Sequence, residues 1–240
     1  MDAMILAAGL GTRLRPLTND TPKPLVRVAG ETLLEHIGRR LIAAGADRII
    51  VNVHHLADQV ERFAQDEWSL DAELVLSHER EGLLGTGGGL AHAARLFRRD
   101  APFFLHVGDV IAEPDFRAFY DAHLASGALA TLAVHERETA RALLFDAQGL
   151  VGRDNRKEGW TRMARDPIGT PERRPFAGIH VISPDLFDGF VEAGPFDIID
   201  AYLREASEGA RILPYDIGSS LWLEIGNPQR LEQARRALES

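Results

Sequence analysis

One stretch decides the fold: Leu6-Ala7-Ala8-Gly9-Leu10-Gly11-Thr12-Arg13-Leu14-Arg15-Pro16-Leu17-Thr18, followed by Thr21-Pro22-Lys23-Pro24-Leu25. Residues 3–8, which lead into it, are apolar and stop at a glycine, which is typical of a buried parallel strand. Gly9 and Gly11 lack a Cβ atom, so backbone N–H groups there can approach an anion closely. Arg13 can donate a forked pair of hydrogen bonds to phosphate oxygens, and Lys23 adds a compact charge between two prolines. The stretch therefore indicates a phosphate site at the end of a strand.

Two other glycine-rich motifs fit this stretch poorly. A dinucleotide-binding fingerprint needs a third glycine where Leu14 stands, and no helix of normal length opens there. A P-loop needs Gly-Lys-Ser or Gly-Lys-Thr, which does not follow. If the glycines are considered alone, the alternative to a phosphate site is a tight turn in which Arg13 and Lys23 are simply solvated.

The rest of the chain alternates apolar runs with amphipathic stretches, which predicts an α/β fold with a mostly parallel, Rossmann-like sheet and helices on both faces. In such a sheet, ligands bind at the carboxyl ends of the strands. Between about 140 and 175 the pattern weakens and suggests hairpins. We expect strands at 3–8, 48–53, 72–76, 101–107, 128–134, 176–182 and 221–225, and helices at 32–44, 56–65, 90–97, 115–125, 197–206 and 228–238.

Composition narrows the function classes. The 240 residues are 45% hydrophobic and 26% charged, with a formal net charge of -9, which disfavours nucleic-acid binding. There is no cysteine, so disulfides, thiolate metal sites and a cysteine nucleophile are excluded. The apolar runs are too short to span a membrane, and the start of the chain does not fit a signal peptide, which predicts a cytoplasmic protein.

The opening stretch resembles the signature loop of sugar-1-phosphate nucleotidyltransferases, Gly-x-Gly-Thr-Arg-Leu-x-Pro-Leu-Thr followed by Pro-Lys-Pro, at every fixed position. The resemblance implies that Arg13 and Lys23 are the catalytic cations, with Arg13 on the β- and γ-phosphates and Lys23 on the α-phosphate or acceptor side. It implies a nucleoside triphosphate and a sugar-1-phosphate as partners. The implied nucleotide-binding residues of this stretch are Leu6, Ala7, Ala8, Gly9, Gly11, Thr12, Arg13 and Lys23.

A second glycine-rich stretch, Leu84-Gly85-Thr86-Gly87-Gly88-Gly89-Leu90, resembles the family segment that lies against the nucleotide base. A flat base can stack on backbone only where side chains are absent, which would explain the glycines. The resemblance adds Thr86, Gly87 and Gly88 to the nucleotide site. Gly85 departs from related subfamilies, which often have a carboxylate there. A loop that caps the following helix is the alternative.

Two carboxylates resemble the metal ligands of the family. Asp109, in Val107-Gly108-Asp109-Val110, follows a central strand, and Glu224, in Trp222-Leu223-Glu224-Ile225-Gly226-Asn227-Pro228, stands where the family usually has aspartate. The resemblance implies that both hold Mg²⁺ as the cofactor. Glutamate is one methylene longer, so contact through water is an alternative for Glu224.

On the sugar-phosphate side, Phe176-Ala177-Gly178-Ile179-His180-Val181 resembles the family strand Phe-x-Gly-Ile-x-Val, which implies that Gly178 binds substrate. The family's acidic residue and lysine before this strand have no clear match. Asn155 is the substrate-binding candidate, with Lys157 and Arg165 as further possibilities. We expect one domain over 1–240, in which about 1–135 bind the nucleotide and about 136–240, with a small lobe, face the sugar phosphate.

The compact length and the Thr-Gly-Gly-Gly form are most similar to N-acetylmuramate-1-phosphate uridylyltransferases. That similarity implies transfer of a nucleoside monophosphate from UTP to N-acetylmuramate-1-phosphate, with release of pyrophosphate. It also implies a role in peptidoglycan recycling and a protein that is a monomer or a homodimer. The alternatives are a mannose-1-phosphate guanylyltransferase, a glucose-1-phosphate thymidylyltransferase-like enzyme and a non-catalytic nucleotide-binding regulatory module. A nicotinamide-dependent dehydrogenase is disfavoured because the third glycine is missing.

Overall fold

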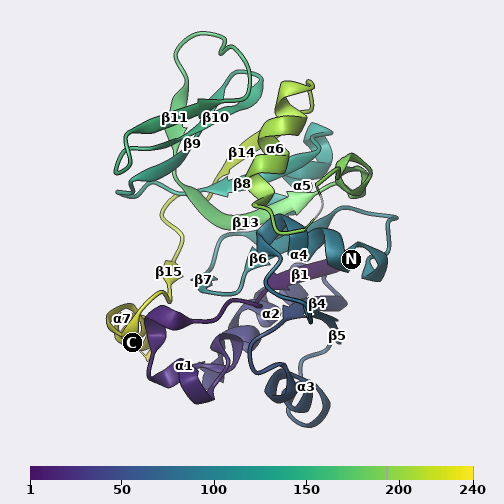
Figure 1. Ribbon diagram of the computed structural model, residues 1–240, viewed down its shortest axis with the longest axis vertical. Coiled ribbons are helices and arrows are strands. Elements are labelled where there is room, and N and C mark those ends of the chain that lie inside the picture. Colours follow the sequence, from purple (N-terminus) through teal and green to yellow (C-terminus); the bar gives the residue numbers. More distant parts are fainter. Residues whose placement is uncertain (193, 240) are drawn as a thin grey trace.

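A seven-stranded sheet forms the centre of the computed structural model, which describes residues 1–192 and 194–239 (Figure 1). The strand order is β14-β8-β13-β6-β1-β4-β5. Strand β13 runs antiparallel to β6 and β8, and the other neighbours are parallel, so the predicted mostly parallel sheet is confirmed. The strands are β1 (Asp2–Leu6), β4 (Arg48–Val53), β5 (Glu73–His78), β6 (Phe103–Val107), β8 (Ala130–Val134), β13 (Phe176–Ile182) and β14 (Ile212–Asp216).

Helices cover both faces of this sheet because the side chains of each strand alternate between the faces. Ala3 and Ile5 of β1 pack with the apolar faces of α2 (Leu33–Ala43), α3 (Ala57–Asp66) and α5 (Phe116–Ser126). Met4 points the other way, to α4 (Gly85–Ala93) and α6 (Ile198–Ser207). The remaining helices are α1 (Leu17–Asp20), α7 (Pro228–Glu239) and four 3₁₀ turns, η1 (Thr12–Leu14), η2 (Lys23–Leu25), η3 (Ala94–Leu96) and η4 (Pro184–Gly189).

Helix α4 differs from the prediction. The sequence predicts a helix over 90–97, whereas α4 begins at Gly85 and gives way to η3 after Ala93. Glycine has a low helix propensity, so a run of three favours a loop when the sequence is considered alone. Tertiary packing reverses this preference, because a Cβ atom on Gly87 would lie 2.2 Å from Cε2 of Phe196. The glycines allow α4 to pack closely against the segment before α6.

The region with the weak pattern folds as a separate antiparallel sheet with the order β11-β10-β9-β12. Its strands are β9 (Arg141–Asp146), β10 (Gly149–Asn155), β11 (Trp160–Met163) and β12 (Glu172–Arg174). Figure 1 shows this sheet at one end of the molecule, next to α6 and β14. The predicted hairpins are confirmed, although their number and pairing were not predicted.

Two-stranded pairings complete the fold. Strands β2 (Arg27–Val28) and β3 (Glu31–Thr32) form one, and β7 (Val110–Ala112) and β15 (Trp222–Glu224) form the other. In the second pair Glu224 lies opposite Val110, and the Ile225 N–H donates to the Asp109 carbonyl at 2.7 Å. This pairing brings the end of the chain to the carboxyl end of β6.

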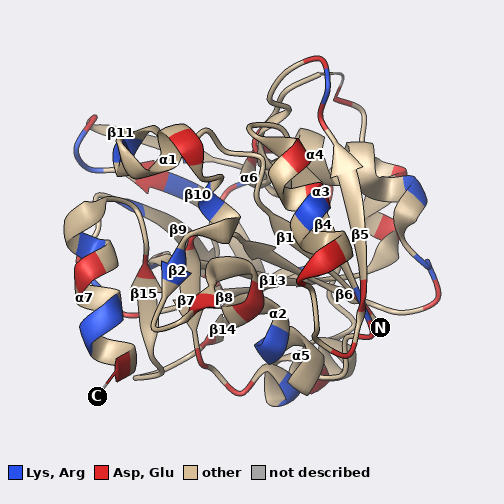
Figure 2. Cartoon of the chain, turned by 90° about the horizontal axis from the view of Figure 1, so that it is seen from below, with Lys and Arg blue, Asp and Glu red and all other residues tan. Residues whose placement is uncertain are grey.

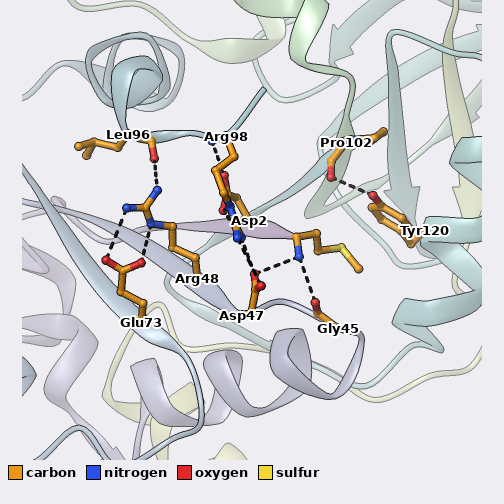
Figure 3. A network of polar contacts seen from close by, with 10 residues as sticks. Asp2, Gly45, Asp47, Arg48, Glu73, Leu96, Arg98, Pro102 and Tyr120 are labelled. Carbon is orange, nitrogen blue, oxygen red and sulfur yellow. Dashed lines mark hydrogen bonds and ion pairs between the residues drawn. The ribbon is translucent and has the colours of Figure 1, made fainter. Parts of the chain in front are cut away.

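Ion pairs connect the amino ends of β1, β4 and β5, at the edge of the sheet opposite the carboxyl end of β6 (Figure 3). Arg98 donates from its backbone N–H and from Nε to the buried carboxylate of Asp2, at 2.6 and 2.8 Å. It also pairs with Asp47, and hydrogen bonds from Arg98 hold the pKa of Asp47 well below its ordinary value. Arg48, the first residue of β4, pairs with Glu73, the first residue of β5.

The surface mixes the two signs of charge. Figure 2 shows basic and acidic residues interspersed along the elements that face the viewer, and α7 carries both. Within residues 1–192 and 194–239, no helix has the length and apolar character needed to cross a membrane.

Two buried histidines predict a specific loss of stability in acid. His123 and His180 contact Thr131 Oγ1 and the Tyr202 hydroxyl, both at 2.9 Å. Burial lowers the pKa of His123 to about 4 and that of His180 to about 3, from an ordinary value of 6.5. The unfolded chain therefore binds protons first, and the free energy of unfolding should fall as the pH drops from 6.5 towards 4, by more than about 1.4 kcal/mol per histidine.

Urea unfolding at a series of pH values between 7 and 4.5 would measure this slope. His123→Gln should reduce it, whereas substitution of the exposed His92 should leave it unchanged. An unchanged slope in the His123 variant would contradict the assignment.

Candidate active site

Two adjoining cavities lie at the carboxyl ends of the central strands and share Val107 and Asp109. The first cavity runs along β1 and the loop that follows it, and the second lies between β13, β15 and the small sheet. The first is lined by Leu6, Ala7, Ala8, Gly9, Lys23, Pro24, Asn52, Glu79, Leu83, Gly85, Thr86, Val107, Gly108 and Asp109. Asp109 therefore stands where the two cavities meet.

The loop after β1 has the geometry that its glycines predict. Gly9 lines the first cavity, and a Cβ atom there would meet nothing within 4 Å, so its backbone is open to a ligand. Gly11 has a φ of 62°, which favours glycine, and its carbonyl accepts from Thr18 Oγ1 at 2.7 Å. Gly11 and Thr12 do not line either cavity; they shape the turn that leads to Arg13.

The two predicted catalytic cations lie in different places. Lys23 lines the first cavity, and its Nζ donates to Asp109 Oδ2 at 2.8 Å. Arg13 is exposed and lies beside Gly226, where a Cβ atom would come 3.4 Å from Nη1 of Arg13 and 3.2 Å from Oε1 of Glu224. Lys23 is thus placed at the junction of the cavities, whereas Arg13 lines neither cavity and lies near Glu224.

β15 pairs with β7 directly after Asp109, so the fold brings Glu224 towards Asp109, as the family resemblance implies. Both carboxylates line the second cavity, and each has a basic partner, Lys23 for Asp109 and Arg230 for Glu224. In the described part of the chain, no three Asp, Glu or His side chains cluster as a metal site. A pair of carboxylates nevertheless fits Mg²⁺, which usually takes one or two carboxylates and completes its shell with water and phosphate oxygens.

Sequence reasoning missed a buried polar pair in the first cavity. Asn52 Oδ1 accepts from the Ala7 N–H at 2.7 Å, and its Nδ2 donates to Glu79 Oε1 at 2.6 Å. Glu79 Oε2 accepts from the Leu84 N–H at 2.9 Å. The pair connects the loop after β1 to the start of α4. A polar residue inside the apolar strand Arg-Ile-Ile-Val-Asn-Val was the signal that could have revealed it.

Only the first part of the glycine run of α4 lines the first cavity. Gly85 and Thr86 line the first cavity, but Gly87 and Gly88 do not. Gly87 packs against Phe196, and a Cβ atom on Gly88 would lie 2.8 Å from the Gly194 carbonyl oxygen. Thr86 Oγ1 donates to Asp197 and accepts from the Ile198 N–H. Protein atoms therefore fill the space that side chains at Gly87 and Gly88 would take, and the role of these glycines against a base stays a prediction.

Gly178 lines the second cavity, as predicted for the acceptor side. Its φ is 83°, and a Cβ atom there would lie 2.5 Å from Val107 Cγ2. Both the backbone conformation and the close contact with Val107 require glycine at this position.

Asn155 does not line either cavity, contrary to the sequence prediction. It is buried, and its Oδ1 accepts from the N–H groups of Lys157 and Glu158, so the side chain forms the turn after β10. Arg165 is also occupied, because both Nη atoms donate to Asp146. The side chains that do line the second cavity include two tryptophans and three arginines that were not predicted: Trp160, Trp222, Arg137, Arg141 and Arg153.

Known proteins with similar sequences cover almost the whole chain. An N-acetylmuramate alpha-1-phosphate uridylyltransferase of Caulobacter vibrioides is 33% identical over 95% of this chain and 92% of its own length. A mannose-1-phosphate guanylyltransferase catalytic subunit beta of Drosophila melanogaster is 32% identical over 95% of this chain and 60% of its own length.

Solved structures match the fold. One of a putative glucose-1-phosphate thymidylyltransferase from Bacillus anthracis superposes with a TM-score of 0.79 at 16% identity, and the match covers 99% of this chain and 95% of the other. The sequence pattern of one family, described as nucleotidyl transferase, matches residues 2–240. With the loop after β1, Lys23 and Asp109 in place, the chain belongs to the nucleotidyl transferase family.

Proposed function

We propose that this chain transfers a uridylyl group from UTP to a sugar-1-phosphate, with N-acetylmuramate-1-phosphate as the acceptor, and releases pyrophosphate. The observation that carries the proposal is the Lys23–Asp109 pair at the junction of the two cavities. A donor triphosphate in the first cavity and an acceptor phosphate in the second would meet there. The cytoplasm and peptidoglycan recycling are the setting that this acceptor implies.

The chemistry needs positioning and charge neutralisation more than a base. The acceptor is already a phosphate dianion, so its oxygen can attack the α-phosphorus in line while pyrophosphate leaves. In this proposal Lys23 would bind the α-phosphate, and Arg13 would bind the leaving phosphates. Asp109 and Glu224 would hold Mg²⁺, which neutralises charge on phosphate oxygens when it is bound. We assign no general base and no covalent nucleophile.

The choice of base and sugar rests on similarity. The uridylyltransferase of Caulobacter vibrioides is matched over nearly its whole length, whereas the guanylyltransferase subunit of Drosophila melanogaster is longer than this chain. The two identities are close, so transfer from GTP to mannose-1-phosphate is the second candidate. A binding module without turnover would be expected to lack Arg13, Lys23 or Asp109, and all three are present.

A panel of four nucleoside triphosphates against several sugar-1-phosphates, followed by pyrophosphate release with and without Mg²⁺, tests the proposal. UTP with N-acetylmuramate-1-phosphate should give the highest kcat/KM, and turnover should require the divalent ion. Faster turnover of GTP with mannose-1-phosphate would select the second candidate. Nucleotide binding without pyrophosphate release from any pair would select the binding module.

A further inference from the structure

One cation in the second cavity lacks an acidic partner. The other charged side chains that line this cavity form ion pairs: Asp109 with Lys23, Glu224 with Arg230, Asp154 with Arg173, Arg153 with Asp197 and Asp200, and Arg141 with Glu158. Among the residues that the structure describes, Arg137 has no ion pair with a carboxylate. Its charge is therefore available to a ligand.

The guanidinium of Arg137 is nevertheless held in place. It lies over the ring of Trp222, with Cζ 4.4 Å from the ring centroid, and its Nη2 donates to the Phe176 carbonyl at 2.9 Å. The Trp222 ring is itself fixed, because Nε1 donates to the Ala177 carbonyl at 2.9 Å. Stacking and a single hydrogen bond orient the group but leave most of its five N–H donors unused.

The exposure of Arg137 supports the same conclusion. The side chain is only partly exposed, and its Nε is buried without a hydrogen-bond partner. Burial lowers the pKa of Arg137 from its ordinary value of 12.5, although arginine stays charged at neutral pH. The charge of Glu224 opposes this shift without forming an ion pair with Arg137. A cation that is partly removed from water and has no directly paired carboxylate gains more from an anion than a solvated one does.

The position of Trp222 relative to Glu224 suggests which part of a ligand reaches Arg137. The two residues are separated by one position on β15, so their side chains lie on the same face, roughly 7 Å apart along the strand. Arg137, Trp222 and Glu224 line the same cavity, so a ligand that fills it meets the guanidinium and the carboxylate together.

We infer that Arg137, stacked on Trp222, is the binding residue for the phosphate monoester of the acceptor sugar. The inference rests on the proposed function, which supplies such an acceptor. A carboxylate on the sugar ring is the other anion that an arginine could bind. The phosphate is favoured because it must reach the junction at Asp109, whereas ring substituents extend away from the reacting atoms.

The test compares Arg137→Gln and Arg137→Lys with Arg117→Gln, which alters an exposed arginine outside both cavities. Titration calorimetry with inorganic phosphate on the full chain needs no turnover. Arg137→Gln should weaken phosphate binding roughly 10- to 100-fold, the loss typical of a charge-assisted contact. Arg137→Lys keeps the charge without the forked guanidinium and should give an intermediate loss of binding. It also provides a second test if Arg137→Gln does not fold.

Steady-state kinetics form the second arm. KM for the acceptor should rise by the same factor in Arg137→Gln, for glucose-1-phosphate and N-acetylmuramate-1-phosphate alike, while KM for UTP changes little. A rise confined to the acceptor with a carboxylate would overturn the phosphate assignment. Phosphate binding that is equal in the wild type and Arg137→Gln, or undetectable in both, would also overturn it. If no acceptor is turned over, the proposed function fails, and the titration alone still decides the role of Arg137.

Discussion

Asp109→Asn is expected to lower kcat on the order of 10³-fold and to leave the fold intact. The carboxylate stands at the junction of the two cavities and accepts from Lys23 Nζ at 2.8 Å. Asparagine has nearly the same shape but no negative charge, so Lys23 loses its ion-pair partner and, in the proposed function, Mg²⁺ would lose a ligand. Preorganised charges at a reacting phosphoryl group are worth about 10²–10³-fold each, and this change affects two of them. Pyrophosphate release under saturating substrates measures the loss.

The fold should not change, because the Asp109 side chain is 30% exposed and its backbone carbonyl, which accepts from Ile225, is unaltered. Far-UV circular dichroism and the thermal midpoint check this point. Asp121→Asn is the matched control, since Asp121 pairs only with Arg117 on the exposed face of α5. A kcat for Asp109→Asn within a few-fold of the wild type would show that Asp109 is not a metal ligand.

The parts of the site that the sequence predicts are those fixed by local geometry. Gly9 and Gly11 precede Arg13 by a few residues, and the strand and the tight turn determine where their backbone lies. Lys23 is likewise held by flanking prolines in η2. The pairing of Asp109 with Glu224 is long-range, and it followed from family resemblance rather than from the residues themselves.

For the glycine run of α4, the deciding contact comes from a distant part of the chain. Gly87 and Gly88 were assigned to a base-binding face, but Phe196 and Gly194, more than one hundred residues later, occupy that space. No local pattern in the glycine run signals such a partner. The same contacts explain why the helix starts at Gly85 instead of Leu90.

The acceptor side shows why residue type is a weak guide in an irregular region. Asn155, Arg165 and Arg137 are all polar residues between β8 and β13, and each could bind a phosphate. Asn155 is used by its own turn, and Arg165 is neutralised by Asp146. Arg137 has no carboxylate partner among the described residues, a difference that depends on how the small sheet and β15 pack. The sequence analysis named Asn155 and Arg165 but not Arg137, and only the tertiary structure distinguishes the three.

Glu224→Gln is expected to lower kcat about 10²–10³-fold, whereas Glu224→Asp should retain activity or raise it. Glutamine removes the charge at constant size, so the ion pair with Arg230 and the proposed metal ligand would be lost together. Aspartate keeps the charge and is the residue that related enzymes commonly carry, and β15 fixes its backbone beside Asp109. Pyrophosphate release at several Mg²⁺ concentrations measures both effects. The apparent Mg²⁺ requirement should rise sharply in Glu224→Gln.

The Glu224→Asp variant also distinguishes direct contact of Glu224 with the metal from contact through water. If Glu224 contacts the metal directly, Glu224→Asp shifts the carboxylate by about one methylene, and the requirement for Mg²⁺ should change in either direction. If contact is through water, the shorter side chain is accommodated and the requirement should stay the same. Glu232→Gln on the exposed face of α7, where Glu232 pairs with Arg236, controls for loss of a surface charge. Full activity of Glu224→Gln at low Mg²⁺ would leave Asp109 as the single protein ligand and assign Glu224 to holding Arg230 alone.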